Sequence, residues 1–339
     1  MTMTDTLVFR DYCPEDKGTI VSLLGAGKPR HYRSEKRAVF DWQFLANPQA
    51  AGRSPFIVGT VDDEIVAVNG LVPVSARAGG EPVAACWSLD TYVSGRHRGR
   101  GFGKSLLEQV TACAPVMLGF GISDMSDPIF AKLGWQLDTT MAAMYFHANE
   151  QGLKGLSKNL LTRFSRALRR RHGRCGAEFA IESSVPMAEL ATLWERVLGH
   201  FPNAVERNGA YLTWRYHQAP VLQYRWVSAR QDDALRAVLI TRHHALESVV
   251  ADYVGPLDEP DLLLGLVDFA CADLVRLGTR RIRCEANHPA VLDALAAAGF
   301  RPYRTPNRFR VHVQAGMALA PSARWFVMTG DSDNDLLVL

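Results

Sequence analysis

Residues 93 to 107 have the sequence V-S-G-R-H-R-G-R-G-F-G-K-S-L-L. A β-branched and aromatic run precedes this stretch, and leucines at helical spacing follow it. The three glycines at alternate positions, 99, 101 and 103, permit positive φ angles and close approach of backbone N–H groups to a ligand. The positive end of the following helix favours an anion, and the interleaved arginines add charge. The pattern predicts a pyrophosphate site; the alternative is a basic surface turn before an ordinary helix.

The glycine spacing separates three kinds of phosphate loop. For a dinucleotide loop, Gly103 comes one residue early, and for an ATP-binding P-loop, Arg98 stands where the first glycine is required. Residues 98–103 (R-G-R-G-F-G) instead resemble the R-x-x-G-x-G/A signature of the GNAT superfamily of acyl-CoA-dependent N-acyltransferases. This resemblance implies a coenzyme A pyrophosphate loop made of Arg98, Gly99, Arg100, Gly101, Phe102, Gly103 and Lys104.

A second segment resembles the same superfamily. Residues 127–135 (D-P-I-F-A-K-L-G-W) are similar to the late helix written F-Y-x-K-L-G-F, and they follow the loop by one helix and one strand, residues 116–122. Phe130 stands where the family frequently has a tyrosine that acts as general acid. Phenylalanine cannot donate a proton, so that role is not transferred, and Phe130 is assigned to the coenzyme site.

The strand W-S-L-D-T-Y-V that enters the loop supplies the candidate catalytic residues. By resemblance it runs beside the thioester, so Tyr92 and Val93 are expected to flank the pantetheine. Alternation places Ser88, Asp90 and Tyr92 on one face. Asp90 is the only carboxylate of this strand, so we interpret it as the general base, direct or through a water; a substrate-anchoring or structural role is the alternative. Ser88 and Ser123 complete the predicted catalytic set.

The chain contains an internal repeat. The pattern W-[QR]-[FY]-x-x-x-P occurs at Trp42 and again at Trp214, and each copy precedes two apolar runs joined by a pair of aspartates. The repeat predicts two copies of one fold. We expect an N-terminal domain over 1–148, a linker over 149–175 and a C-terminal domain over 176–339. Each tryptophan is expected to mark the repeat and to anchor its own core.

The second copy lacks the coenzyme loop. At the matching place it has D-E-P-D, residues 258–261, whose carboxylates would repel an anion. Only the first copy is therefore expected to bind coenzyme A. Between the copies, residues 153–174 carry eight arginines and lysines with leucines at helical spacing. A membrane-surface helix and an RNA-binding helix are possible readings, and a linker helix that packs its leucines on a domain is the favoured one.

Composition limits the class of protein. The 339 residues are 47% hydrophobic and 22% charged with a net charge of +3, as in a two-domain globular protein. Six scattered cysteines without a C-x-x-C pair predict free thiols, and no spacing suggests a metal site. No signal peptide or spanning segment is recognisable. These features favour a cytoplasmic protein without stable membrane insertion or a nucleic-acid partner.

The predicted fold class is mixed α/β with tandem GNAT folds. The predicted activity moves an acetyl or short hydroxyacyl group from an acyl-CoA co-substrate to a primary amine, without a metal. The run W-F-V-M-T-G-D-S-D at 325–333, with the tandem arrangement, resembles bacterial GNAT proteins of surface-polysaccharide and amino-sugar assembly. A nucleotide-linked amino sugar is therefore the candidate acceptor, and a homodimer is one possible assembly. The alternatives are a non-catalytic acyl-CoA-binding protein and, ranked lower, aminoacyl transfer from tRNA.

Overall fold

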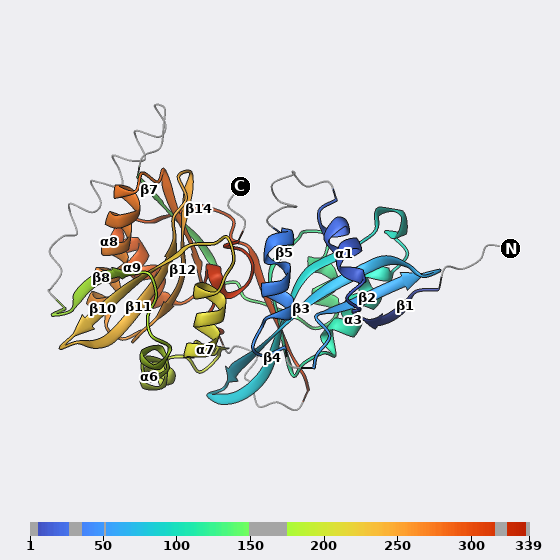
Figure 1. Ribbon diagram of the computed structural model, residues 1–339, viewed down its shortest axis with the longest axis horizontal. Coiled ribbons are helices and arrows are strands. Elements are labelled where there is room, and N and C mark those ends of the chain that lie inside the picture. The colour runs from blue at the N-terminus through green and yellow to red at the C-terminus, as the bar shows by residue number, and fades with distance from the viewer. Residues whose placement is uncertain (1–5, 27–35, 51, 149–174, 316–323, 337–339) are drawn as a thin grey trace.

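The computed structural model describes residues 6–26, 36–50, 52–148, 175–315 and 324–336. Within these residues the chain forms two mixed β-sheets that lie side by side, with helices packed against each (Figure 1). The predicted mixed α/β class with two sheets is confirmed. The predicted basic linker helix falls outside the described residues.

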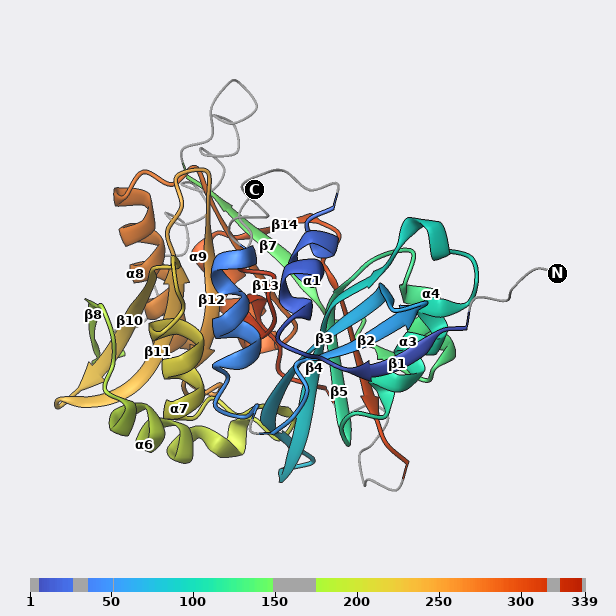
Figure 2. The ribbon, with the colours of Figure 1, turned by 45° about the vertical axis from the view of Figure 1, so that its right-hand side comes forward.

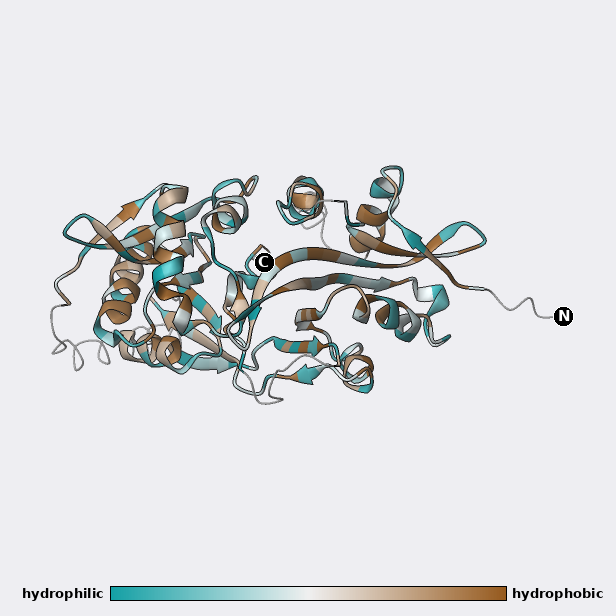
Figure 3. Ribbon diagram, turned by 90° about the horizontal axis from the view of Figure 1, so that it is seen from below, coloured by the Kyte–Doolittle hydropathy of each residue, from teal (hydrophilic) through white to brown (hydrophobic). Residues whose placement is uncertain are grey.

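The first sheet is built mainly from the N-terminal half of the chain. In spatial order its strands are β1 (Val8–Asp11), β2 (Phe56–Val61), β3 (Glu64–Ala78), β4 (Glu81–Val93), β5 (Val116–Ile122), β15 (Arg308–Val313) and β6 (Gln136–Leu137), and β9 (Ala204–Val205) pairs with β3. Its helical segments are α1 (Asp16–Leu24), η1 (Asp41–Leu45), η2 (Gly95–His97), α3 (Phe102–Thr111) and α4 (Asp127–Lys132). The long strands of this sheet are rich in hydrophobic residues (Figure 3), and β3 is buried along most of its length.

The second sheet is built mainly from the C-terminal half. In spatial order its strands are β14 (Arg301–Arg304), β7 (Ala142–His147), β13 (Arg281–Ala286), β12 (Glu247–Val254), β11 (Ala234–Arg242), β10 (Tyr224–Gln231) and β8 (Glu178–Glu182). Its helical segments are α6 (Met187–Val197), η3 (Leu198–His200), α7 (Gly209–Leu212), η4 (Thr213–His217), α8 (Pro260–Arg276), α9 (Pro289–Ala298) and η5 (Thr329–Asp331).

The two halves exchange strands. β7, from the first half, pairs between β13 and β14 of the second sheet, whereas β15, from the second half, pairs with β5 of the first (Figure 2). One hydrophobic core therefore contains side chains from both halves. We propose that residues 1–148 and 176–339 are two copies of one fold, and that each copy contributes a strand to the sheet of the other.

The two repeat tryptophans contact each other instead of anchoring separate cores. Each lies in a short π-helix, η1 or η4. The indole N–H of Trp42 donates to the backbone oxygen of Trp214 at 2.8 Å, and the reverse bond measures 3.0 Å. The rings lie 5.5 Å apart. The expectation of two separate anchors is therefore wrong, because the matched positions of the two copies meet at the junction between them.

The reciprocal hydrogen bonds are expected to stabilise this junction. Trp214→Phe removes one donor from a buried carbonyl, which should lower the free energy of unfolding by about 1–2 kcal/mol beyond the loss of ring volume. Trp226→Phe is the matched control, because Trp226 is equally buried and its indole nitrogen has no hydrogen-bond partner among the described residues. Urea unfolding of both variants measures the difference, and equal losses would contradict this role of the junction bonds.

Candidate active site

The glycine-rich loop lies between β4 and α3. Gly101 immediately precedes α3 with φ +86°, and Gly99 has φ +79°, conformations that favour glycine. A Cβ atom at either position would meet no atom within 4 Å. The loop therefore borders open space at the positive end of a helix of 10 residues.

This open space is a groove of about 440 Å³. Every predicted coenzyme residue lines it except Arg100 and Phe130. Arg100 is exposed, and Phe130 is buried against Trp135 with ring centroids 4.8 Å apart. His97 also lines the groove and stacks on Phe102.

The strands β4 and β5 separate at this place. Their parallel pairing covers three residue pairs and ends at Trp87 and Leu118, although β4 continues to Val93 and β5 to Ile122. A second cavity, of about 540 Å³, is lined by the diverging ends of both strands. It shares Thr91, Ser123 and Ser126 with the groove, so the two spaces adjoin at these hydroxyl side chains.

A β-bulge interrupts β4 beside the cavity. Asp90 and Thr91 together oppose the single residue Asn69 of β3, and Asp90 has φ +52°. The hydroxyls of Ser88 and Thr91 both donate to Oδ1 of Asn69, at 2.9 and 2.6 Å. The predicted strict alternation, with Thr91 on the opposite face from Ser88, is therefore wrong here, because a bulge redirects the side chains of its strand.

Asp90 forms a buried charge cluster with two residues distant in sequence. Its Oδ2 lies 2.6 Å from Nζ of Lys36, which is also 3.6 Å from Oδ2 of Asp333. Burial raises the pKa of the Asp90 carboxyl, the Lys36 ammonium opposes this shift and the Asp333 carboxylate adds to it. The cluster thus sets two carboxyl groups against one ammonium.

Arginines from β13 and β14 also line this cavity. Arg281 lies 2.7 Å and Arg283 3.0 Å from Glu247, whereas Arg304 lies 3.1 Å from the fully buried Glu285. Three guanidinium groups face two carboxylates, and the side chain of Arg304 is 49% exposed. The cavity lining thus combines guanidinium groups of the second sheet with the carboxylates of Asp90, Asp333 and Glu247.

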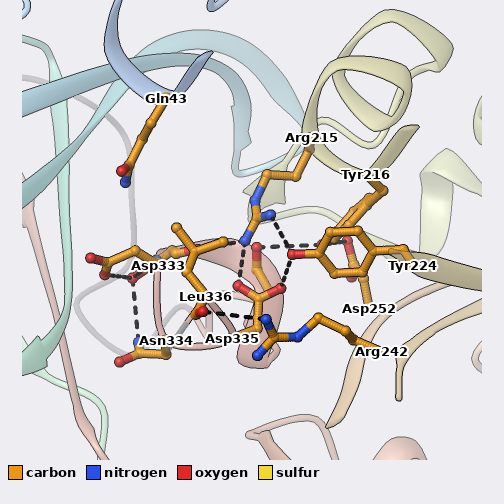
Figure 4. Close-up of polar contacts among 12 residues, drawn as sticks. Gln43, Arg215, Tyr216, Tyr224, Arg242, Asp252, Asp333, Asn334, Asp335 and Leu336 are labelled. Atoms are coloured by element: carbon orange, nitrogen blue, oxygen red, sulfur yellow. Dashed lines mark hydrogen bonds and ion pairs between the residues drawn. The ribbon is translucent and has the colours of Figure 1, made fainter. Parts of the chain in front are cut away.

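The C-terminal segment 324–336 carries Asp333 into the site (Figure 4). Its neighbour Asp335 is fully buried and accepts bonds from Arg215 at 2.5 Å and from the hydroxyl of Tyr224 at 2.6 Å. Arg283 donates to the backbone oxygen of Asn334 at 2.9 Å. These contacts fix the segment, so that Asp333 and Asn334 line the cavity.

The remaining predicted residues occupy the walls of the two spaces. Ser123 is exposed at their junction, with its Oγ 2.8 Å from that of Ser126. Ser88 is buried on the cavity side. Phe130 lines the larger cavity instead of the groove, where its ring offers no proton donor.

Sequence reasoning missed Lys36, Asn69, Asp333 and the arginines of the second sheet. Lys36, Asn69 and these arginines stand in no motif, whereas Asp333 is the last residue of the run W-F-V-M-T-G-D-S-D. That run was the one available signal for the C-terminal segment.

Solved structures of proteins from several organisms have a fold similar to that of this chain. A GCN5-related N-acetyltransferase from Anabaena variabilis matches with 10% identity and a TM-score of 0.62, over 91% of this chain and 73% of that one. A GCN5-related N-acetyltransferase from Kribbella flavida matches with 13% identity and a TM-score of 0.59, over 92% of this chain and 72% of that one. Saccharomyces cerevisiae N-myristoyltransferase with bound myristoyl-CoA matches with 12% identity and a TM-score of 0.55, over 92% of this chain and 83% of that one.

These similarities show that the chain has the fold of the GCN5-related N-acetyltransferases. No family model and no curated protein matches its sequence. Among the described residues, no helix is long and apolar enough to cross a membrane. The same residues contain no group of three or more histidine, cysteine or acidic side chains that could hold a metal ion.

Proposed function

We propose that the protein is an N-acyltransferase that moves an acyl group from coenzyme A to a primary amine. The observation that carries this proposal is the meeting of two spaces at the separation of β4 and β5. One is a groove beside a glycine-rich cationic loop, and the other is a polar cavity with a buried carboxylate. A thioester in the first and an amine in the second would lie close together.

In this proposal the loop holds the coenzyme. Backbone N–H groups at Gly101 and Gly103 and the charges of Arg98, Arg100 and Lys104 would bind the pyrophosphate. Tyr92 and Val93 line the groove between the loop and the cavity, where the pantetheine would pass. The co-substrate is acetyl-CoA or another acyl-CoA, and the second copy binds none.

Asp90 would act as general base. It takes a proton from the ammonium of the acceptor, directly or through a water, and the amine nitrogen then attacks the thioester carbonyl carbon. As the carbon–sulfur bond breaks, the nitrogen loses a second proton, and this proton reaches the departing thiolate through a water or through the hydroxyl of Ser123 at the junction. Burial raises the pKa of Asp90, which makes this carboxylate a stronger base than an exposed aspartate. Ser88 would support the bulge through Asn69.

The acceptor that we propose is a nucleotide-linked amino sugar used in surface-polysaccharide assembly. Its amine would lie near Asp90 and Asp333. Its phosphates would lie near Arg281 and Arg304, because guanidinium groups bind phosphate through paired N–H donors. Six cysteines without a disulfide fit a reducing compartment such as the cytoplasm.

A non-catalytic acyl-CoA-binding protein is the second candidate. The observation in its favour is Phe130, which is buried against Trp135 where the family frequently has a tyrosine. Such a protein would keep the groove and its ligand but release no coenzyme A.

Thiol release from acetyl-CoA decides between the two candidates. We expect free coenzyme A to appear in proportion to added amine when purified protein is incubated with a panel of amines and UDP-linked amino sugars. Mass spectrometry should detect the matching amide. Binding of acetyl-CoA by calorimetry, without amine-dependent thiol release for any acceptor, would reject the enzyme in favour of the second candidate.

A further inference from the structure

The buried ion pair between Lys36 and Asp90 joins side chains that line different cavities. Asp90 lines the acceptor cavity, whereas Lys36 lines a third cavity, of about 340 Å³, and does not line the acceptor cavity. Asp333 lines both. The ammonium therefore contacts Oδ2 of Asp90 from outside the space where the acceptor would lie. A side chain in this position acts on the reaction through Asp90 and not through the substrate.

The ammonium of Lys36 is held in place by several partners. The residue is only 2% exposed, and its Nζ lies 2.6 Å from Oδ2 of Asp90 and 3.6 Å from Oδ2 of Asp333. Nζ also donates to Oε1 of Gln43 at 3.3 Å and lies 5.6 Å from the ring centroid of Phe44. The two carboxyl groups and the amide oxygen offset the cost of burying this charge.

The internal repeat shows how unusual this cation is. Gln43 in the first copy corresponds to Arg215 in the second, and both side chains extend toward the C-terminal segment (Figure 4). Arg215 carries its own charge to Asp335, whereas Gln43 is neutral and accepts a hydrogen bond from Lys36. In the first copy the cation at this place therefore comes from Lys36, which lies outside the repeated motif.

Asp90 meets Lys36 from a strained backbone position. Among the described residues it is the one non-glycine residue inside a strand with a positive φ, +52°. Strained residues of this kind cluster at functional sites. The bulge at Asp90 changes the direction of the side chains of β4, and the carboxylate meets the ammonium there.

The charges around Asp90 act in opposite directions. Burial raises the pKa of its carboxyl, the ammonium of Lys36 lowers this pKa, and the carboxylate of Asp333 raises it. The other charged or titratable side chains that line the two cavities are Glu247, Arg281, Arg283, Arg304, Arg242, His243 and His244. Among the described residues, Lys36 is the cation in contact with Asp90.

We propose that Lys36 is a positioning residue of the acyl-transfer site, whose ammonium keeps the buried carboxylate of Asp90 ionised and holds its Oδ2. The other oxygen, Oδ1, is then the atom that takes the proton of the acceptor. This role rests on the proposed function of Asp90 as general base. Without Lys36, burial and Asp333 favour the protonated carboxyl, which cannot act as a base.

Titration of the Asp90 carboxyl by ¹³C NMR tests the ion pair in the full-length protein without substrate. The ¹³Cγ resonance is assigned by its loss in Asp90→Asn. In Lys36→Met its titration midpoint should move up by at least about one pH unit, because a cation at this distance lowers the pKa of a carboxyl by about that much or more. Lys36→Gln is a second neutral variant, whose amide is a polar neighbour for the carboxyl groups if methionine prevents folding.

Two further variants serve as controls for the titration. Lys36→Arg keeps the charge, so its midpoint should lie close to that of the wild type. Lys17 also pairs with a carboxylate, Asp41 at 2.7 Å, and lies over an aromatic ring, but it lines neither cavity. Lys17→Met should therefore leave the Asp90 midpoint unchanged. An unmoved midpoint in the folded neutral variants of Lys36 would overturn the proposal.

The pH profile of amine-dependent thiol release gives a second measurement. In Lys36→Met the fall of kcat/KM at low pH should begin at a correspondingly higher pH, and kcat/KM should return toward the wild-type value at alkaline pH. A merely structural role would instead reduce kcat/KM by the same factor at every pH, and that result would also overturn the proposal. The NMR titration needs no turnover, so an unmoved midpoint is distinct from a failed thiol-release assay, which would reject the transferase itself.

Discussion

Replacing Gly101 with valine is expected to abolish coenzyme A binding. A Cβ at this position meets no protein atom within 4 Å, and Gly101 lines the groove. The valine side chain would therefore occupy space that the pyrophosphate needs for contact with the backbone. Calorimetric titration with coenzyme A should give no measurable heat of binding for the variant, in contrast to the wild type.

The strain of valine at a positive φ needs its own control. Gly80 has φ +87° against +86° for Gly101, and a Cβ there also meets nothing within 4 Å. It lies in the turn between β3 and β4, at the other end of these strands from the loop. Gly80→Val thus carries the same backbone strain but should bind coenzyme A normally. Normal affinity in a folded Gly101→Val, or equal loss in both variants, would remove the loop from the coenzyme site.

Replacing Asp90 with asparagine is expected to lower kcat/KM by about 10²–10⁴-fold with coenzyme affinity nearly unchanged. Asparagine keeps the shape and the bulge but cannot accept the proton of the acceptor. The carboxylate lies in the acceptor cavity and not in the coenzyme groove, so the KM for acyl-CoA should stay close to that of the wild type.

The pH profile tests the same role. The base works only when it is ionised, and burial raises the pKa of Asp90. As the pH is lowered, wild-type kcat/KM should therefore begin to fall at a higher pH than it would with an ordinary aspartate as base. In Asp90→Asn this fall of kcat/KM at low pH should disappear. The difference in kcat/KM between the variant and the wild type should become smaller at high pH, where the acceptor amine deprotonates without help. A deficit independent of pH and confined to the KM of the acceptor would reassign Asp90 to substrate anchoring.

Asp333→Asn is the matched control for Asp90. Asp333 contacts the same Lys36 at a longer distance and lines the same cavity, but it lies on the C-terminal segment and not on β4. We expect its replacement to change mainly the KM of the acceptor. A larger loss of kcat in Asp333→Asn than in Asp90→Asn would transfer the role of base to Asp333. Thermal unfolding of both variants checks that the charge cluster remains folded.

The local pattern of residue types in the sequence predicted several strands and turns of the structure. The run 116–122 forms β5 as expected, and the run 56–61 forms β2. The aspartate pairs at 62–63 and 232–233 form matching hairpin turns in which all four residues have positive φ. Such turns require that conformation at both central residues, and aspartate tolerates it better than most residues. These features depend on neighbouring residues alone.

By itself, the sequence determined the glycine loop with its helix and the strand that carries Asp90, because each is encoded within a short run of residues. Only the tertiary structure decided the exchange of β7 and β15, the bulge at Asp90, and the meeting of Lys36 with Asp333. Strand pairing and buried ion pairs join residues hundreds of positions apart, and their energy depends on the whole packed core. The local periodicity of a segment does not specify which distant strand or charged residue it will contact.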